Sequence, residues 1–366
     1  MIYTNMHSDC EMQEEEFCDS DMKEEKSKEV ESLRANIYYA PHLITQLGDL
    51  LLDRYYVECL LSDGHMSNVW LCWDLEAMRQ VVIKIAREAY TNNAMICVEK
   101  DTLKELDRFG LKSPHRKRIV EMFDDFLLVT PRTSLCCLVL EAMDGTVMDL
   151  IARDKRLPLM TVKNISMQIF EGLVFLHKCH IVHTDIKPEN VFFTYIDERR
   201  PIVRIKIGDF GNSFSEHRQT SVLIQTPPYR SVEVILGAGI SKSSDIWSVG
   251  CMIFEMVTTK YLFDFDCTDF VKSNREHLKL ITEILGPIPF HLIFKGDYSQ
   301  MYFDANCRLI SIDDLNPECI RNILIEVYGI PRSEAEPLAW FLEYTLQLDP
   351  KERPTAEQCL SHDWLS

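Results

Sequence analysis

Two short segments carry side chains of the types that phosphate chemistry uses. Residues 183–190 read His-Thr-Asp-Ile-Lys-Pro-Glu-Asn, and an Asp-Phe-Gly triplet begins at Asp209, nineteen residues after Asn190. Phosphoryl transfer needs a carboxylate at the attacking hydroxyl, a cation near the phosphates and hard oxygen ligands for Mg²⁺. Asp185 suits the first role and Lys187 the second, while Asn190 and Asp209 suit the third. The two motifs at this separation therefore predict a phosphotransfer site that uses ATP and Mg²⁺.

A second set of residues, nearer the N-terminus, has the pattern of a nucleotide site. Residues 61–69 read LSDGHMSNV and join two expected strands, as a phosphate-covering loop does. The central glycine lets the backbone approach phosphates closely. The outer two positions of the GxGxxG pattern are serines here. We expect five residues of this loop to contact the nucleotide: Leu61, Ser62, Gly64, Ser67 and Val69.

Lys84 ends a Val-Val-Ile-Lys run that matches the lysine-bearing strand of nucleotide phosphotransferases. Such a lysine holds the α- and β-phosphates and pairs with a glutamate on the following helix. Glu99 lies inside the expected helix, whereas Glu88 precedes it and Glu105 lies near its end. We therefore favour Glu99 as the partner, with an ordinary exposed helix carboxylate as the alternative interpretation.

The elements that must position these residues follow from the hydrophobic pattern. Three runs rich in Val, Ile, Trp and Tyr predict strands, residues 91–109 predict a helix, and two further runs after it predict strands again. Together they predict an N-lobe over residues 55–143, with five strands and one helix, after a lead-in segment at 37–54. The five predicted strands are 55–61, 68–74, 80–86, 123–129 and 135–141.

After residue 143 the pattern becomes mainly helical. Apolar residues at intervals of three or four predict a helix over 162–178, and 245–258 is apolar nearly all round, as a buried helix is. Short strands are expected at 191–193, directly after the first motif, and at 203–207, just before the second. The sequence therefore predicts an α+β fold of two lobes, with a helical C-lobe over residues 144–366.

The composition is that of a soluble globular protein. The 366 residues are 46% hydrophobic and 26% charged, enough apolar content for a sizeable core. The net charge of −18 disfavours nucleic acid and anionic membranes as partners and favours a basic partner. No 18-residue apolar run and no secretory signal are present, so no membrane association is expected. The 13 cysteines lack CxxC pairs and zinc-site spacing, which predicts reduced thiols in an intracellular protein of the cytoplasm or nucleus, expected as a monomer.

Residues 1–36 are a separate acidic segment. They contain 11 acidic and 4 basic side chains, a net charge of 4 − 11 = −7, and few apolar residues. This composition predicts a disordered tail. Two interpretations are open: a solubilising extension, or a pseudosubstrate or partner segment that contacts a basic ligand.

Taken together, the motifs resemble those of the SR-protein-specific kinases, a family of eukaryotic protein kinases. The resemblance covers about residues 50–366. It implies a bilobal protein kinase fold, and transfer of phosphate from Mg-ATP to serines in Arg/Ser-rich proteins such as splicing factors. The matching segments are GHMSNVWL at 64–71, HTDIK at 183–187, QTPPYRSVE at 225–233, DIWS at 245–248 and CLSHDWL at 359–365.

The resemblance also implies roles for single residues. It makes Asp185 the catalytic base and places the adenine between Val69 and a hinge that includes Glu141 and Met143. Thr226 resembles a threonine that bonds the catalytic aspartate and the catalytic lysine, which closes the loop on the substrate side.

Other positions bear on regulation and stability. Glu233 and Arg353 resemble a buried ion pair that ties the substrate-side loop to the end of the C-lobe. Thr184 stands where many kinases carry an arginine that requires a phosphate on the activation loop. We therefore expect activity without phosphorylation of that loop. Phe210 and Pro227-Pro228 depart from the family pattern, and the proline pair puts the preferred serine context in question.

Two acidic residues could dock a basic substrate. Glu276 and Glu283 fall where the family binds substrate arginines, and their spacing of seven places them on one helix face. Lys260 replaces a further acidic position of the family, which should weaken or shift docking. The alternative for these acids is an ordinary solvated surface.

Three further interpretations are open. Only 18 residues separate Asn190 from Asp209, so the chain is a compact member without the long insert of the family. Residues 274–278 and 284–289 are similar to the LAMMER-type kinases, although 279–283 lacks their defining motif. An acidic module for basic peptides could coexist with catalysis. A pseudokinase scaffold is disfavoured because all the expected catalytic side chains are present: Lys84, Glu99, Asp185, Asn190 and Asp209.

Overall fold

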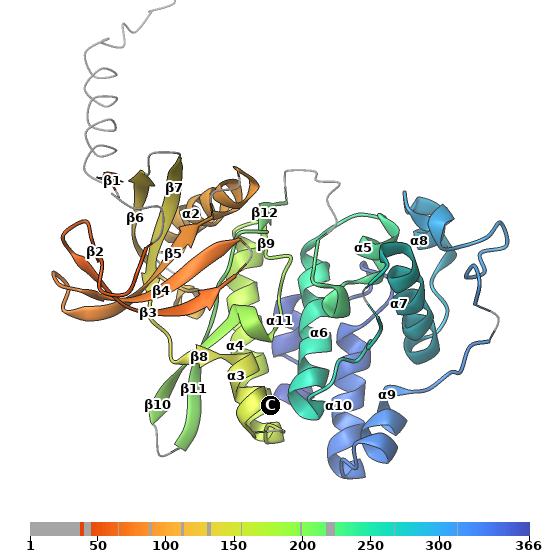
Figure 1. Ribbon diagram of the computed structural model, residues 1–366. Coiled ribbons are helices and arrows are strands. Elements are labelled where there is room, and N and C mark those ends of the chain that lie inside the picture. Colours follow the sequence, from red (N-terminus) through yellow and green to blue (C-terminus); the bar gives the residue numbers. More distant parts are fainter. Residues whose placement is uncertain are drawn as a thin grey trace, which may run out of the picture.

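A computed structural model gives the fold of the chain in two lobes (Figure 1). It describes residues 37–39, 45–64, 66–87, 90–110, 113–129, 133–154, 156–197, 200–216, 224–266, 268–312 and 314–366. The acidic segment 1–36 lies outside the described residues, so its predicted disorder stays a prediction. The predicted α+β bilobal fold is confirmed.

The N-lobe is built on a curled sheet of seven strands, in the order β1-β6-β7-β5-β4-β3-β2 (Figure 1). The prediction of five strands was too low by two. Both additional strands, β1 at Ile37–Tyr39 and β2 at Leu50–Leu51, are very short and lie at the sheet edges. The five predicted strands are β3 Tyr55–Asp63, β4 Ser67–Asp74, β5 Arg79–Ala86, β6 Met122–Val129 and β7 Ser134–Glu141.

The helix of the N-lobe, α2 at Tyr90–Gly110, confirms the prediction for 91–109. It contacts β5, β6 and β7 of the sheet. Ile96, Leu103 and Leu106 are buried and follow each other at intervals of seven and three, so they form the apolar face of the helix. This packing fixes the side of α2 on which Glu99 lies.

The C-lobe is organised around two buried helices, α4 at Leu159–Lys178 and α6 at Lys242–Thr258 (Figure 1). Within the part of the chain that the structure describes, one helix, α4, is long and apolar enough to cross a membrane. Of its apolar stretch, 61% is buried inside the protein, which is typical of a core helix. The other helices are α3 Val147–Asp154, α5 Val232–Leu236, α7 Phe270–Leu285, α8 Phe290–Lys295, α9 Ile320–Asn322, α10 Arg332–Thr345 and α11 Ala356–Leu360.

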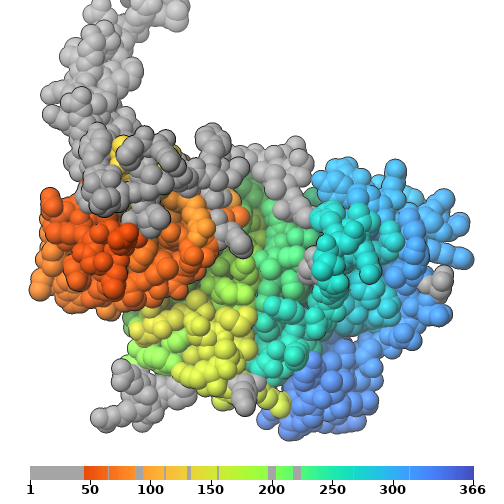
Figure 2. Space-filling model, in the orientation of Figure 1, coloured from red at the N-terminus to blue at the C-terminus, as the bar shows by residue number. Residues whose placement is uncertain are grey.

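Short strands of the C-lobe hold the two motif segments. The first motif lies between β9 at Ile181–Val182 and β10 at Val191–Asp197, and the second follows β11 at Arg200–Ile207. Strands β10 and β11 form an antiparallel hairpin, and β10 also pairs with β8 at Gly145–Thr146, just after the hinge. Figure 2 shows the yellow segment that follows the hinge directly against the orange N-lobe strands.

Candidate active site

Asp245, near the start of α6, fixes the backbone of the first motif. Its two carboxylate oxygens accept the N–H groups of His183 (3.0 Å) and Thr184 (2.8 Å). Thr184 has φ +71°, a left-handed conformation that is costly for a β-branched residue. The fully buried Asp245 therefore holds a turn that would not form on its own.

The ring of His183 joins the two motifs. Its Nδ1 accepts the N–H of Asp185 (3.2 Å), and its Nε2 lies 2.9 Å from the carbonyl of Gly208, just before the second motif. This pattern assigns the ring proton to Nε2. The ring also makes an edge contact with Phe210 at 5.0 Å between centroids. The two segments are thereby held in one arrangement.

Asp185 lies at the centre of a dense hydrogen-bond network. Its Oδ1 accepts the hydroxyl of Thr226 (2.7 Å), and its Oδ2 accepts the side-chain amide of Asn190 (3.1 Å). Lys187 Nζ lies 3.3 Å from the same Oδ2 and donates to Thr226 Oγ1 at 3.0 Å. The structure thus brings the four side chains together as the sequence predicted, with Asp185 only 8% exposed.

Lys84 bridges the two lobes. Its Nζ lies 2.6 Å from Glu99 and 2.8 Å from Asp209, so Glu99 pairs with Lys84 as predicted, while Glu88 lies outside the described residues. Burial lowers the pKa of Lys84, but the two carboxylates outweigh burial and the pKa lies above its usual range. The Lys84 ammonium holds the pKa of Asp209 below its ordinary value. Lys84 and Asp209 therefore stay charged across the physiological pH range.

The oxygens of Asn190 and Asp209 fit a hard cation. Asn190 uses its NH₂ group toward the backbone oxygen (2.8 Å) and side chain of Asp185, which leaves the amide oxygen for a metal. Asp209 has φ +61° and contacts Lys84 through one oxygen, Oδ1. A carboxylate and an amide oxygen beside a lysine match the donor set that Mg²⁺ takes with phosphates.

The glycine-containing loop lies at the end of the β3–β4 hairpin. Val69 pairs with Lys84 across β4 and β5, so the loop ends next to the lysine. Arg87 donates to Asn68 (3.1 Å) and pairs with Asp63, which holds the base of the loop. Four residues predicted to contact the nucleotide lie in this hairpin, and their role stays a prediction: Leu61, Ser62, Gly64 and Ser67.

The hinge is fixed by two partner side chains that sequence analysis did not identify, Lys206 and Thr194. Glu141 Oε1 accepts the N–H of Glu121 (2.7 Å) and Lys206 Nζ (2.5 Å). Met143 accepts the hydroxyl of Thr194 at 3.5 Å. The Glu141 side chain is thus used within the protein, so the backbone is the part of the hinge that can bind an adenine.

A buried arginine in the substrate-side loop was also missed. Arg230 is 7% exposed and donates to the carbonyls of Ile224 (3.0 Å) and Gln225 (2.9 Å) and to Asn274 of α7 (3.3 Å). Gln225 in turn donates to Ser248 of α6 at 2.9 Å. This end of the loop is therefore held by contacts within the protein.

A buried acid lies beneath the same loop. Glu255 of α6 is 4% exposed and accepts the hydroxyl of Tyr229, three residues after Thr226, at 2.5 Å. Burial raises the pKa of Glu255 to about 7; the Tyr229 hydroxyl opposes this rise and the charge of Glu189 adds to it. Glu189 belongs to the first motif and is exposed. The charge of Glu189 thus acts on Glu255, which is joined through Tyr229 to the loop that carries Thr226.

The predicted docking acids lie on α7, but they are already partly engaged. Lys279 lies 3.3 Å from Glu276 and 4.0 Å from Glu283. Glu283 also accepts the N–H of Asn316 at 2.8 Å, and its side chain is 9% exposed against 40% for Glu276. Glu276 is therefore the more accessible of the two acids.

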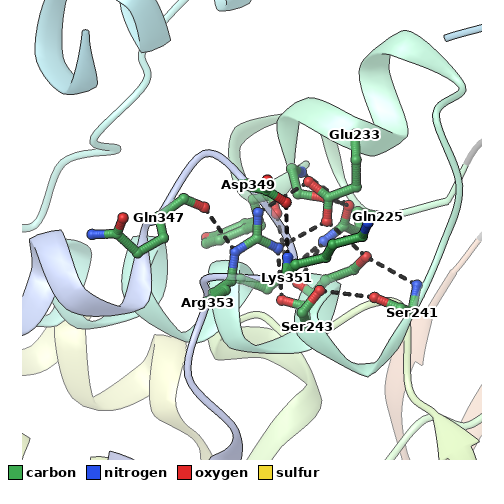
Figure 3. A network of polar contacts seen from close by, with 12 residues as sticks. Gln225, Glu233, Ser241, Ser243, Gln347, Asp349, Lys351 and Arg353 are labelled. Carbon is green, nitrogen blue, oxygen red and sulfur yellow. Dashed lines mark hydrogen bonds and ion pairs between the residues drawn. The ribbon is translucent and has the colours of Figure 1, made fainter. Parts of the chain in front are cut away.

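The predicted ion pair of the C-lobe is bidentate. Arg353 contacts both carboxylate oxygens of Glu233, at 2.8 and 3.0 Å, and both residues are buried (Figure 3). Arg353 also donates to the carbonyls of Gln347 (3.1 Å) and Ser243 (2.8 Å). The pair links the substrate-side loop, α6 and the segment before α11.

Comparison with known proteins identifies the family. Residues 55–365 match the protein kinase domain. The chain is 31% identical to the serine/threonine-protein kinase SRPK of Physarum polycephalum, with 88% of each protein covered, and 30% identical to the serine/threonine-protein kinase AFC3 of Arabidopsis thaliana, with 88% of this chain and 84% of AFC3 covered. It is 25% identical to the SRSF protein kinase 3 of Sus scrofa over 498 aligned positions, more than its own 366 residues, so the alignment has long gaps opposite this compact chain. The chain therefore belongs to the protein kinase family, as an SRPK-like serine/threonine kinase.

Proposed function

We propose that this kinase transfers the γ-phosphoryl group of Mg-ATP to serines in Arg/Ser-rich proteins such as splicing factors. The observation that carries the proposal is the buried Glu255, whose partner Tyr229 lies in the same loop as Thr226, because a buried acid that is affected by the charge of a second acid favours a cationic ligand. In support, two of the similar proteins are named SRPK and SRSF protein kinase 3.

Each residue of the site has a role in this proposal. Asp185 accepts the proton of the attacking serine hydroxyl, and Lys187 stabilises the transferred phosphoryl group. Thr226 holds both side chains in register through bonds of 2.7 and 3.0 Å. Asn190 and Asp209 would hold Mg²⁺, which supplies charge neutralisation at the phosphate oxygens.

Further residues hold the nucleotide. Lys84, oriented by Glu99, binds the α- and β-phosphates. The hinge from Glu141 to Met143 offers backbone groups to the adenine, opposite Val69. The remaining loop contacts proposed for ATP come from Leu61, Ser62, Gly64 and Ser67.

The substrate arginine next to the serine is proposed to lie between Glu189 and Glu255. A guanidinium bonds carboxylates through two parallel N–H groups and stays charged at every relevant pH. Because Glu255 is buried, its carboxylate has lost most of its hydration. A cationic partner stabilises the ionised carboxylate in place of that water. Glu276, the exposed acid on α7, is proposed as a second contact farther along the substrate.

We also propose that activation-loop phosphorylation is not required and that the enzyme works as a monomer inside the cell. Thr184 donates its hydroxyl to the carbonyl of Asn212 at 2.8 Å, where an arginine would need an anion. Arg230 donates to two uncharged acceptors of the same loop, the carbonyls of Ile224 and Gln225. Each cysteine in the described parts of the chain is a free thiol, which fits the cytoplasm or nucleus.

The test is a kinase assay that compares an Arg/Ser-repeat peptide with an acidic-site peptide. We expect preferential phosphorylation of the Arg/Ser peptide on serine, and loss of turnover with retained ATP binding in Asp185→Ala. Equal use of the acidic peptide would remove the Arg/Ser specificity and favour another serine/threonine kinase, the LAMMER type included. No turnover of any peptide by the unmodified protein would favour a pseudokinase scaffold.

A further inference from the structure

The hinge between the lobes rests on the β10–β11 hairpin. Lys206 of β11 reaches Glu141, the last residue of β7, with 2.5 Å between Nζ and Oε1. Asp144 donates its N–H to the carbonyl of Phe193 (2.9 Å) and accepts the N–H of Tyr195 (2.8 Å). The hinge therefore cannot shift without moving the hairpin.

The other end of the same hairpin carries the proposed metal ligands. Strand β10 begins directly after Asn190, and β11 ends at Ile207, two residues before Asp209. Gly208 donates its N–H to the carbonyl of Asn190 at 3.0 Å. A Cβ at Gly208 would lie 2.8 Å from a ring carbon of Phe192, so the strands meet here without space to slip.

Lys206 and Glu141 form an ion pair in this connection. The side chain of Lys206 is 14% exposed and that of Glu141 17%, so the pair is largely shielded from solvent and from salt. The same oxygen of Glu141 accepts the N–H of Glu121 at 2.7 Å, which fixes its direction. By contrast, the bond from the Asp144 N–H to the Phe193 carbonyl joins two backbone groups, which a substitution cannot remove.

We propose that Lys206 is a positioning residue for the nucleotide: with Glu141 it forms an interlobe brace that sets the distance between the hinge backbone and the oxygens of Asn190 and Asp209. The brace acts on a ligand that is held at both ends, its base at the hinge and its phosphates at the metal. A small displacement of either end weakens both sets of contacts at once. Because Lys206 touches neither end of the nucleotide, its removal should affect nucleotide binding more than the chemical step. This inference rests on the proposed ATP site.

The test uses Lys206→Met in the full chain, with steady-state kinetics and titration with ADP. We expect a rise of roughly tenfold in KM for ATP and in the dissociation constant of ADP, with kcat within about twofold and an unchanged KM for the peptide. Lys206→Arg should restore part of the affinity. The matched control is Lys178→Met, which removes an exposed surface pair with Glu357 (2.7 Å) and should change none of these values.

A second variant distinguishes the loss of positioning from the effect of leaving the carboxylate of Glu141 buried and unpaired. In Glu141→Gln/Lys206→Met no unpaired carboxylate remains, but the brace is still absent. A raised KM for ATP in this double variant supports the brace. Normal ATP affinity in the double variant, or in Lys206→Met alone, would overturn it. If the unmodified protein itself binds no ADP, the proposed ATP site fails instead, so the two failures are distinguishable.

Discussion

The proposed arginine site makes the use of basic substrates depend on pH in a way that the structure specifies. Glu255 has a pKa of about 7 in the free protein. A group with that pKa is about 9% ionised at pH 6 and about 91% ionised at pH 8. Because only the ionised carboxylate attracts a guanidinium, kcat/KM for an arginine peptide should rise roughly tenfold between these pH values through this group alone.

The readout is the ratio of the rates for two peptides, which cancels any titration that affects both rates equally. Rates are measured at saturating ATP, and at peptide concentrations below KM, for an Arg/Ser peptide and for the same peptide with citrulline in place of arginine. Citrulline keeps the shape of the side chain and removes its charge. A titration that affects only the chemical step or the nucleotide acts on both peptides equally, so the ratio reports the acids that contact arginine.

Three variants should change the pH dependence of this ratio in different ways. Glu255→Gln should make the ratio independent of pH. Glu189→Gln removes a like charge, so the pKa of Glu255 falls and the midpoint moves to lower pH. Tyr229→Phe removes a hydrogen bond to the ionised form, so the midpoint moves to higher pH. A constant ratio in the unmodified protein, or a persistent rise in Glu255→Gln, would refute the reasoning.

Three other predictions follow from single contacts. Arg353→Met strands the buried Glu233 and should lower the free energy of unfolding by about 3–5 kcal/mol in urea titrations, whereas pairing it with Glu233→Leu should recover much of the loss. Lys279→Ala frees Glu276 and Glu283 and should tighten binding of a long Arg/Ser peptide about two- to fivefold at low salt; an unchanged affinity would place docking elsewhere. Phosphatase-treated protein should keep its full kcat, and a loss of activity restored by rephosphorylation would remove the proposed independence from loop phosphate.

The parts of the fold that were predicted correctly are those with a local cause. The strands β3 to β7 are eight or nine residues long and rich in apolar residues, and α2 is 21 residues long, so each could be recognised without its neighbours. The missed strands β1 and β2 are three and two residues long. They exist because β6 and β3 offer free edges, and no pattern of two or three residues can show that.

The same distinction applies to the site. The spacing within each motif was sufficient to bring Asp185, Asn190 and Asp209 together, and helix length selected Glu99. The brace from Lys206 to Glu141 joins residues 65 positions apart, in two segments that each look ordinary. Glu255 did give a signal, since it is an acid within the apolar stretch of a helix, and a buried charge of that kind needs a partner.

The total charge of −18 and the proposed arginine site make separate contributions to substrate choice, and salt distinguishes them. Exposed acids such as Glu276 attract a basic peptide at long range, and this attraction is screened beyond about 8 Å at physiological ionic strength. The buried Glu255 acts at contact distance, where salt has little effect. Raising salt should therefore lower kcat/KM for the Arg/Ser peptide at both pH 6 and pH 8 by a similar factor, while the rise between the two pH values persists. If high salt abolishes that rise as well, the pH dependence comes from surface charge, and Glu255 is not the residue that binds arginine.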